Sequence, residues 1–173
     1  MVRITLPDLP SKRLVNTVLT WLSGLLLSTA AMAAPSHPAI NAFTTWCFIA
    51  GQTEAQAHAN MRTNGAAFDL IFWDKTLEPA PSTPAHVERR CEVSFDGDHR
   101  DSAVKDVQAK MAAPPVFGTS IPLTAPYEAT DGTAYIDARA LLRGRGAVVH
   151  IGLKDQRTFI RVDRLPAGMG LGT

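Results

Sequence analysis

Two cysteines, Cys47 and Cys91, are the only ones in a chain of 173 residues. If they join, they close a loop of about 45 residues and restrict how the first half of the chain can fold. An isolated pair usually forms a disulfide in an exported protein, whereas in the cytoplasm it stays reduced. The compartment therefore decides how strongly these two residues constrain the fold.

The N-terminal segment has the order of parts that is typical of a secretory signal peptide. It opens with a short basic stretch that contains Arg3, Lys12 and Arg13. Residues 14–34 then carry no charged side chain, and an Ala-x-Ala sequence within them ends at Ala33. We predict that residues 1–33 are a cleaved signal peptide and that residues 34–173 form a periplasmic or secreted protein.

A retained membrane anchor is the alternative for this segment, because about 21 uncharged residues can span a bilayer. Polar residues within the run favour cleavage, so we expect no membrane span in the mature chain. Export in turn predicts a disulfide between Cys47 and Cys91. A redox or metal-binding pair is the alternative for the cysteines, but the sequence contains no Cys-x-x-Cys motif.

Composition indicates a globular domain, since 46% of the residues are apolar and 19% are charged. Cleavage removes three of 17 basic and one of 16 acidic residues, which leaves a net charge of −1 and no reason to expect nucleic acid as a partner. The charge is split, with −5 over residues 34–133 and +4 over residues 134–173. Such a split marks either a binding surface or two halves that face each other.

Apolar residues at helical spacing predict three helices. The first begins near Pro38 and carries Cys47 on its apolar side. The second follows a capping box, Thr-x-x-Gln, that starts at Thr53. The third is capped by Asp101 or Ser102 and ends where the prolines of the next loop begin.

Period-two alternation predicts an antiparallel sheet around these helices. Residues 86–95 alternate so that Cys91 faces the core, and residues 112–133 form a Pro-rich loop with a short edge strand over 116–123. The last third of the chain predicts a three-strand meander over residues 134–142, 147–153 and 157–165. Residues 34–173 are thus predicted to be one α+β domain, with a helical pair and a further helix packed on the sheet and one disulfide.

The meander provides the candidate binding surface. Steps of two along its strands predict a single polar face that carries arginines and aromatic rings. The six candidate residues on this face are Tyr135, Arg139, His150, Arg157, Phe159 and Arg161. Arginine forks on a rigid sheet suit carboxylate or phosphate groups, and the rings add stacking. A solvated face without a ligand is the alternative.

The sequence contains no motif that identifies a reaction, so we predict a non-enzymatic binding or accessory protein of the cell envelope without metal or cofactor. Its partner is expected to be an envelope protein or an anionic envelope component. A small hydrolase or lyase is an alternative, with His99 or His150 as base beside Asp98 or Asp137. A structural or inhibitory protein that acts through residues 118–125 of the Pro-rich loop is another.

Three segments carry a resemblance to known proteins. They are Phe43-x-x-x-Cys47, Arg90-Cys91-Glu92-Val93-Ser94-Phe95 and Arg161-x-Asp163-Arg164. With them the chain resembles small exported proteins of alphaproteobacteria over most of residues 40–165. The resemblance implies location and fold and no activity, and the Pro-rich loop departs from it.

Overall fold

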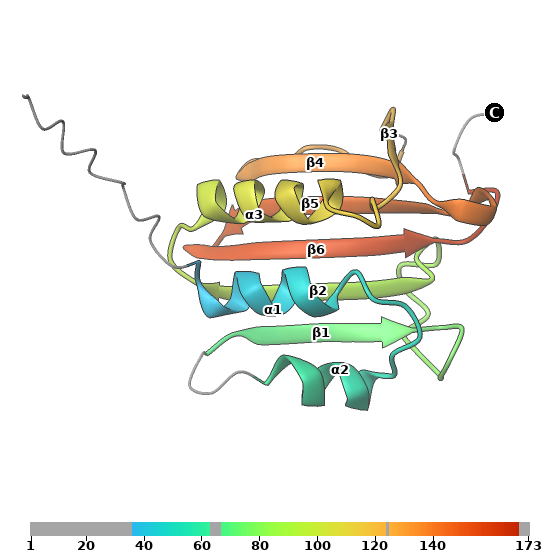
Figure 1. Ribbon diagram of the computed structural model, residues 1–173, viewed down its shortest axis with the longest axis horizontal. Helices are drawn as coiled ribbons and strands as arrows, with labels where there is room; N and C mark the ends of the chain where they lie inside the picture. Colours follow the sequence, from blue (N-terminus) through green and yellow to red (C-terminus); the bar gives the residue numbers. More distant parts are fainter. Residues whose placement is uncertain (1–35, 63–66, 124, 170–173) are drawn as a thin grey trace, which may run out of the picture. The chain divides into compact units, whose positions relative to one another are not determined.

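The centre of the fold is an antiparallel sheet whose strands lie in the order β1-β2-β6-β5-β4-β3 (Figure 1). The strands are β1 (Asp69–Asp74), β2 (Arg89–Asp96), β3 (Thr119–Ile121), β4 (Thr133–Ala140), β5 (Gly146–Lys154) and β6 (Arg157–Leu165). The structure is a computed structural model and describes residues 36–62, 67–123 and 125–169. The predicted signal peptide, residues 1–33, lies outside the described residues.

The predicted meander is confirmed, because β4 pairs with β5 and β5 with β6, each time antiparallel. Strand β6 also pairs with β2, which joins the meander to the first half of the chain. The predicted edge strand is shorter than expected, and β3 pairs along the outer side of β4. The α+β class predicted from the sequence is confirmed.

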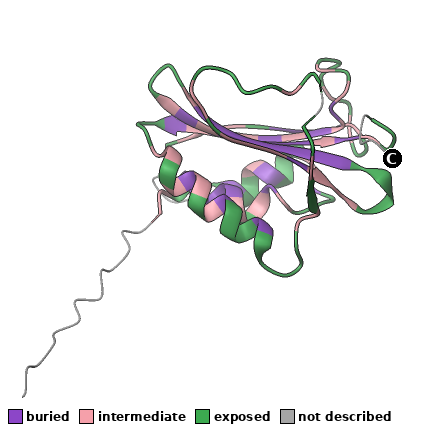
Figure 2. Cartoon of the chain, turned by 90° about the horizontal axis from the view of Figure 1, so that it is seen from above, coloured by how far each residue is buried: buried purple, intermediate pink, exposed green. Residues whose placement is uncertain are grey.

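Three helices cover one face of the sheet within the described residues, as Figure 2 shows from above. They are α1 (Pro38–Trp46), α2 (Glu54–Met61) and α3 (Arg100–Ala112). The predicted capping box of α2 is present, with Thr53 and Gln56 each bonded to the other's backbone N–H. No helix in these ranges combines the length and the apolar composition that a membrane crossing requires.

The start of α3 differs from the prediction that Asp101 or Ser102 caps it. The helix begins at Arg100, after His99. The backbone N–H of His99 donates to Thr158 Oγ1 of β6 at 2.8 Å, and the hydroxyl of Ser102 donates to the carbonyl of His99 at 2.9 Å. A contact 59 residues away along the chain thus sets where the helix begins.

The main core lies between the helices and the sheet. Side chains of α1 and α3 pack there on alternate residues of β2, β5 and β6. The residues predicted to face the core from β2, namely Cys91, Val93 and Phe95, are fully buried. The predicted disulfide is confirmed, since Cys47 at the end of α1 is bonded to Cys91 of β2 with the Cα atoms 5.5 Å apart. This bond fastens the first helix to the sheet.

A second, smaller apolar cluster lies on the opposite face, on which none of the helices in the described residues packs. It contains Trp73, Val87, Ala138, Val148 and Leu165. Residues of two loops pack against it, among them Ala80 from the β1–β2 loop and Tyr127 from the Pro-rich loop. The rings of Tyr127 and His86 meet edge to face with centroids 5.4 Å apart. The helix-free face is therefore partly covered by loops.

Removal of the disulfide tests how strongly it ties the helices to the sheet. We expect the variant Cys47→Ala/Cys91→Ala to lose about 2–4 kcal/mol of unfolding free energy, because the closed loop spans about 45 residues. Urea unfolding followed by circular dichroism measures the difference. Two free thiols in the oxidised wild-type protein, or an unchanged midpoint in the variant, would contradict the assignment.

Candidate functional site

The six residues predicted to share one polar face lie on two opposite faces, so this prediction is wrong. Tyr135 and Arg139 pair with Ile151 and Ala147 of β5, both fully buried under the helices. The polar residues on this side of β4 led us to predict that it faces solvent, but this side of the strand lies beside α3. The apolar side of the same strand, with Ala138, packs into the second cluster instead.

On the helix-covered side, the donors of Arg139 are used in hydrogen bonds within the protein. Its guanidinium donates to the carbonyls of Phe117 and Gly118 at 3.0 and 2.9 Å and to Asp137 Oδ2 at 3.0 Å. The hydroxyl of Tyr135 donates to the same Asp137 oxygen at 3.1 Å. Arg139 thereby holds the segment after α3 against the sheet edge.

The other four candidates lie on the helix-free face, and three of them line a cleft of about 390 Å³. The cleft lies between residues 126–131 of the Pro-rich loop and the strands β2, β5 and β6. Its predicted members are His150, Phe159 and Arg161. Its other lining residues are Glu92, Pro126, Tyr127, Glu128, Thr130, Asp131, Leu153 and Lys154. A volume of this size is at the lower end of the range for small-ligand sites.

A fully buried carboxylate, Asp163, lies beside the cleft on β6. Arg90 donates to both its oxygens, from Nε at 2.7 Å and from Nη2 at 2.8 Å, and the hydroxyl of Tyr127 donates to Oδ2 at 3.2 Å. Burial tends to lower the pKa of Arg90, but the bonds to Asp163 outweigh it and raise that pKa. Burial and the neighbouring carboxylate raise the pKa of Tyr127. The Tyr127 hydroxyl therefore stays protonated and anchors the Pro-rich loop to the sheet.

His150 is 5% exposed and is held between two partners. Arg161 Nη2 lies 3.0 Å from its Nδ1, and Thr133 Oγ1 lies 2.9 Å from its Nε2. Arginine can only donate, so Nδ1 accepts and the ring proton is on Nε2, which donates to the threonine hydroxyl. Burial and then the charge of Arg161 lower the pKa of His150 to about 4. His150 is thus a neutral positioning group for Arg161.

Arg161 is held in place but keeps most of its donors free. Its guanidinium carbon lies 5.8 Å from the centre of the Phe159 ring, and that ring meets the His150 ring edge to face at 5.0 Å. Glu92 Oε2 and Asp163 Oδ2 are 3.5 and 3.7 Å from its nitrogens, which is too far for good hydrogen bonds. The bond to His150 is its one hydrogen bond to the described residues.

Arg157 lies on the same strand and face as Arg161 but outside the cleft lining. It donates to Asp69 at 2.6 Å, to Asp96 at 2.9 Å and to the carbonyl of Ser94 at 3.2 Å. These bonds use its guanidinium to join β1, β2 and β6. Arg157 is therefore a matched comparison for Arg161 in experiments.

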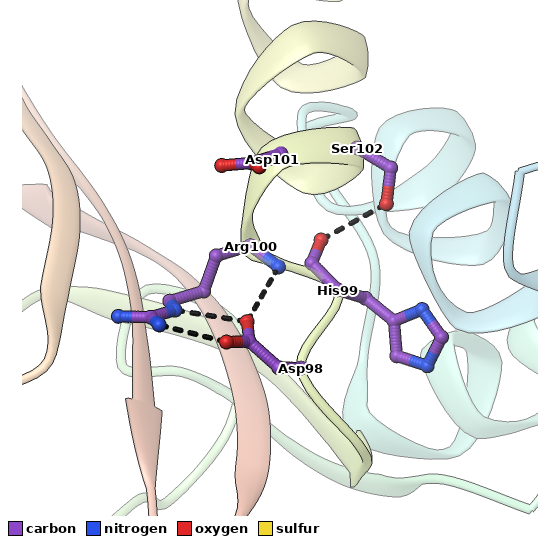
Figure 3. A pocket seen from close by; sticks show the side chains of 5 residues that line it. All are labelled: Asp98, His99, Arg100, Asp101 and Ser102. Carbon is purple, nitrogen blue, oxygen red and sulfur yellow. Dashed lines mark hydrogen bonds and ion pairs between the residues drawn. The ribbon is translucent and has the colours of Figure 1, made fainter.

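The histidine–aspartate pairs that the hydrolase alternative needs do not come together. Asp137 pairs with Val149 on the helix-covered side, opposite to His150. Asp98 and His99 line a shallow pocket at the start of α3, where Arg100 donates to both Asp98 oxygens (Figure 3). These hydrogen bonds lower the pKa of Asp98 to about 2. The ring of His99 points away from Asp98 in Figure 3, and it lies 4.9 Å from the ring of His37.

Several residues of the cleft were not predicted. Arg90, Glu92, Tyr127 and Asp163 belong to it or support it, and only the alternation along β2 and β6 hinted that Arg90, Glu92 and Asp163 share a face. Nothing in the sequence placed Tyr127 near them. Within the part of the chain that the structure describes, no group of three His, Cys, Asp or Glu side chains is placed to hold a metal ion.

Comparisons with protein-family models, with curated proteins and with solved structures found no match to this chain.

Substitution of Asp163 tests whether the cleft depends on its ion pair. We expect Asp163→Asn to cost about 3 kcal/mol or more of unfolding free energy, because Arg90 then keeps a charge without its partner. Chemical denaturation at pH 7 measures this loss. The control Asp96→Asn, at an exposed position, is expected to change stability very little. Equal effects of the two substitutions would contradict the assignment.

The lowered pKa of His150 makes stability depend on pH. Below pH 6.5 the unfolded chain takes up a proton at His150 while the folded chain stays neutral until about pH 4. Stability therefore falls as the pH drops through this window, by about 2 kcal/mol from this group between pH 7 and pH 5. Urea unfolding at both pH values should show a smaller fall in His150→Gln. An equal fall in both proteins would refute the assignment.

Proposed function

We propose that this protein is a non-enzymatic binding module of the cell envelope, and that its cleft receives an anionic group of its ligand on Arg161. The observation that supports the proposal is that the Arg161 side chain is held in place while most of its hydrogen-bond donors are unused by the described residues. His150 and Phe159 hold it in one place, yet it uses one hydrogen bond to the described residues. A fixed guanidinium with free donors suits a carboxylate, which can accept two parallel bonds.

Binding is favoured over catalysis by the proton on His150. Because Nδ1 accepts from Arg161, Nε2 donates to Thr133 and cannot take a proton from that hydroxyl. The lowered pKa also makes the ring a weak base. The cleft therefore contains a positioned cation without an activated nucleophile among the residues that line it.

The envelope location rests on the predicted signal peptide and on the disulfide. The bond between Cys47 and Cys91 is compatible with an oxidising compartment outside the cytoplasm. The ligand would then be part of an envelope protein or an anionic envelope component.

The Pro-rich loop supports this proposal better than an inhibitory role of its own. Tyr127 is bonded to Asp163 and packs on the second cluster, and residues 126–131 form a wall of the cleft. The segment of the inhibitory alternative, residues 118–125, contains β3, which pairs with β4 and so belongs to the sheet. In this proposal the loop forms one wall of the binding site.

Titration of the purified protein with N-acetylalanine, a carboxylate without an ammonium group, tests the proposal. We expect amide shifts in the ¹H–¹⁵N spectrum at Phe159, Arg161 and the 126–131 wall, together with a shift of the Arg161 Nε–Hε signal. Arg161→Gln should weaken binding about tenfold or more, because charge-assisted hydrogen bonds are lost.

Arg157→Gln is the matched control, since it removes the same charge from the same strand and face outside the cleft. It should leave the affinity for N-acetylalanine within about twofold, since it loses only a distant, screened charge. Equal weakening by both substitutions would show a general effect of charge and contradict a site on Arg161.

A further inference from the structure

We propose that the ligand of the cleft is a zwitterion of the size of an amino acid or a short peptide, with its carboxylate on Arg161 and its ammonium group against Glu128 and Asp131. The inference rests on the proposed function and names the ligand class. The juxtaposition that carries it is a cation on the sheet and two carboxylates on the loop that faces it.

The charges that line the cleft do not suit a purely anionic ligand. Three acidic side chains, Glu92, Glu128 and Asp131, face two basic ones, Arg161 and Lys154. A polyanion that enters this space meets more negative than positive charge, which opposes binding. A ligand with one positive and one negative group matches both signs.

Arg161 and the two loop carboxylates lie on different walls of the cleft, while Glu92 lies on the sheet wall with its Oε2 3.5 Å from Arg161. Arg161 lies on β6, while Glu128 and Asp131 lie on the loop, where both are exposed. Neither loop carboxylate has a hydrogen bond to another described side chain or an ion pair within the described residues, whereas Asp98, Asp137 and Asp163 do. The two loop carboxylates are thus available to a ligand ammonium group.

The remaining surface of the cleft gives the expected size and polarity of the ligand. The volume of about 390 Å³ holds a compound of a few tens of atoms at most. Pro126 and Phe159 contribute apolar surface between the charged walls. This surface suits a small apolar side chain next to the two charged ends.

Three probes with one backbone separate the contributions of the two charged ends. Alanylalanine carries both charges, N-acetyl-alanylalanine carries the carboxylate alone, and alanylalaninamide carries the ammonium group alone. Titration of the full mature chain by calorimetry or NMR at about 150 mM salt, where long-range attraction is screened, measures the three affinities. We expect alanylalanine to bind about fivefold tighter than either of the others, or better.

Removal of the loop carboxylates tests where the ammonium group binds. The variant Glu128→Gln/Asp131→Asn should bring the affinity for alanylalanine to within about twofold of that for the acetylated probe, since both probes then lack a partner for the N-terminal end. The control Glu54→Gln/Asp101→Asn removes two carboxylates from the helices on the other face. It should leave the preference for alanylalanine unchanged.

The possible failures are distinguishable. Equal binding of alanylalanine and the acetylated probe, with loss of both in Arg161→Gln, would overturn the zwitterion inference and support the proposed function. A preference for alanylalanine that survives the loop double variant would overturn the role of Glu128 and Asp131. Absence of binding by all three probes would overturn both proposals.

Discussion

The helix-free face is organised around one buried charge, the carboxylate of Asp163. A carboxylate without access to water is costly unless cations and donors surround it. Arg90 supplies two bonds from the neighbouring strand, and Tyr127 supplies a third from the Pro-rich loop. The same group therefore brings together β2, β6 and a loop that would otherwise be free to leave the sheet. The cleft exists because that loop is held there.

Three arginines on this face, Arg90, Arg157 and Arg161, show how partners decide the role of a side chain. Arg90 donates two hydrogen bonds to the carboxylate of Asp163. Arg157 joins three strands through its bonds to Asp69, Asp96 and Ser94. Among the described residues, Arg161 has one hydrogen-bonding partner, the neutral imidazole of His150. A ligand can gain most from the arginine whose donors are least used. For this reason we propose Arg161, rather than Arg90 or Arg157, as the residue that binds the ligand.

Ion pairs in the structure also explain why acidic and basic residues are unevenly distributed along the chain. Basic residues of the last third pair with acidic residues of the first part, as Arg161 does with Glu92 and Arg157 with Asp69. The two oppositely charged parts thus face each other across β2 and β6, as one of the two interpretations of the sequence predicted. The lining of the cleft departs from this pairing, because Glu128 and Asp131 on the loop wall lie opposite Arg161 on the sheet.

Elements whose sequence signals are local could be predicted before the structure was known. The Thr53–Gln56 capping box placed α2, and alternation in β2 placed Cys91 in the core. The isolated pair of cysteines in a chain expected to be exported predicted the bond between Cys91 and Cys47. Period-two patterns likewise identified the meander.

The two sides of each strand were therefore known, but their assignment to the helices or to the loops was not, because both faces of this sheet are partly covered. The three-dimensional arrangement of the strands was needed to show that Tyr135 and Arg139 lie beside α3, while Phe159 and Arg161 lie under the Pro-rich loop. The physical reason is that contacts such as Arg90–Asp163, 73 residues apart in the chain, set the face, and strand periodicity carries no information about them.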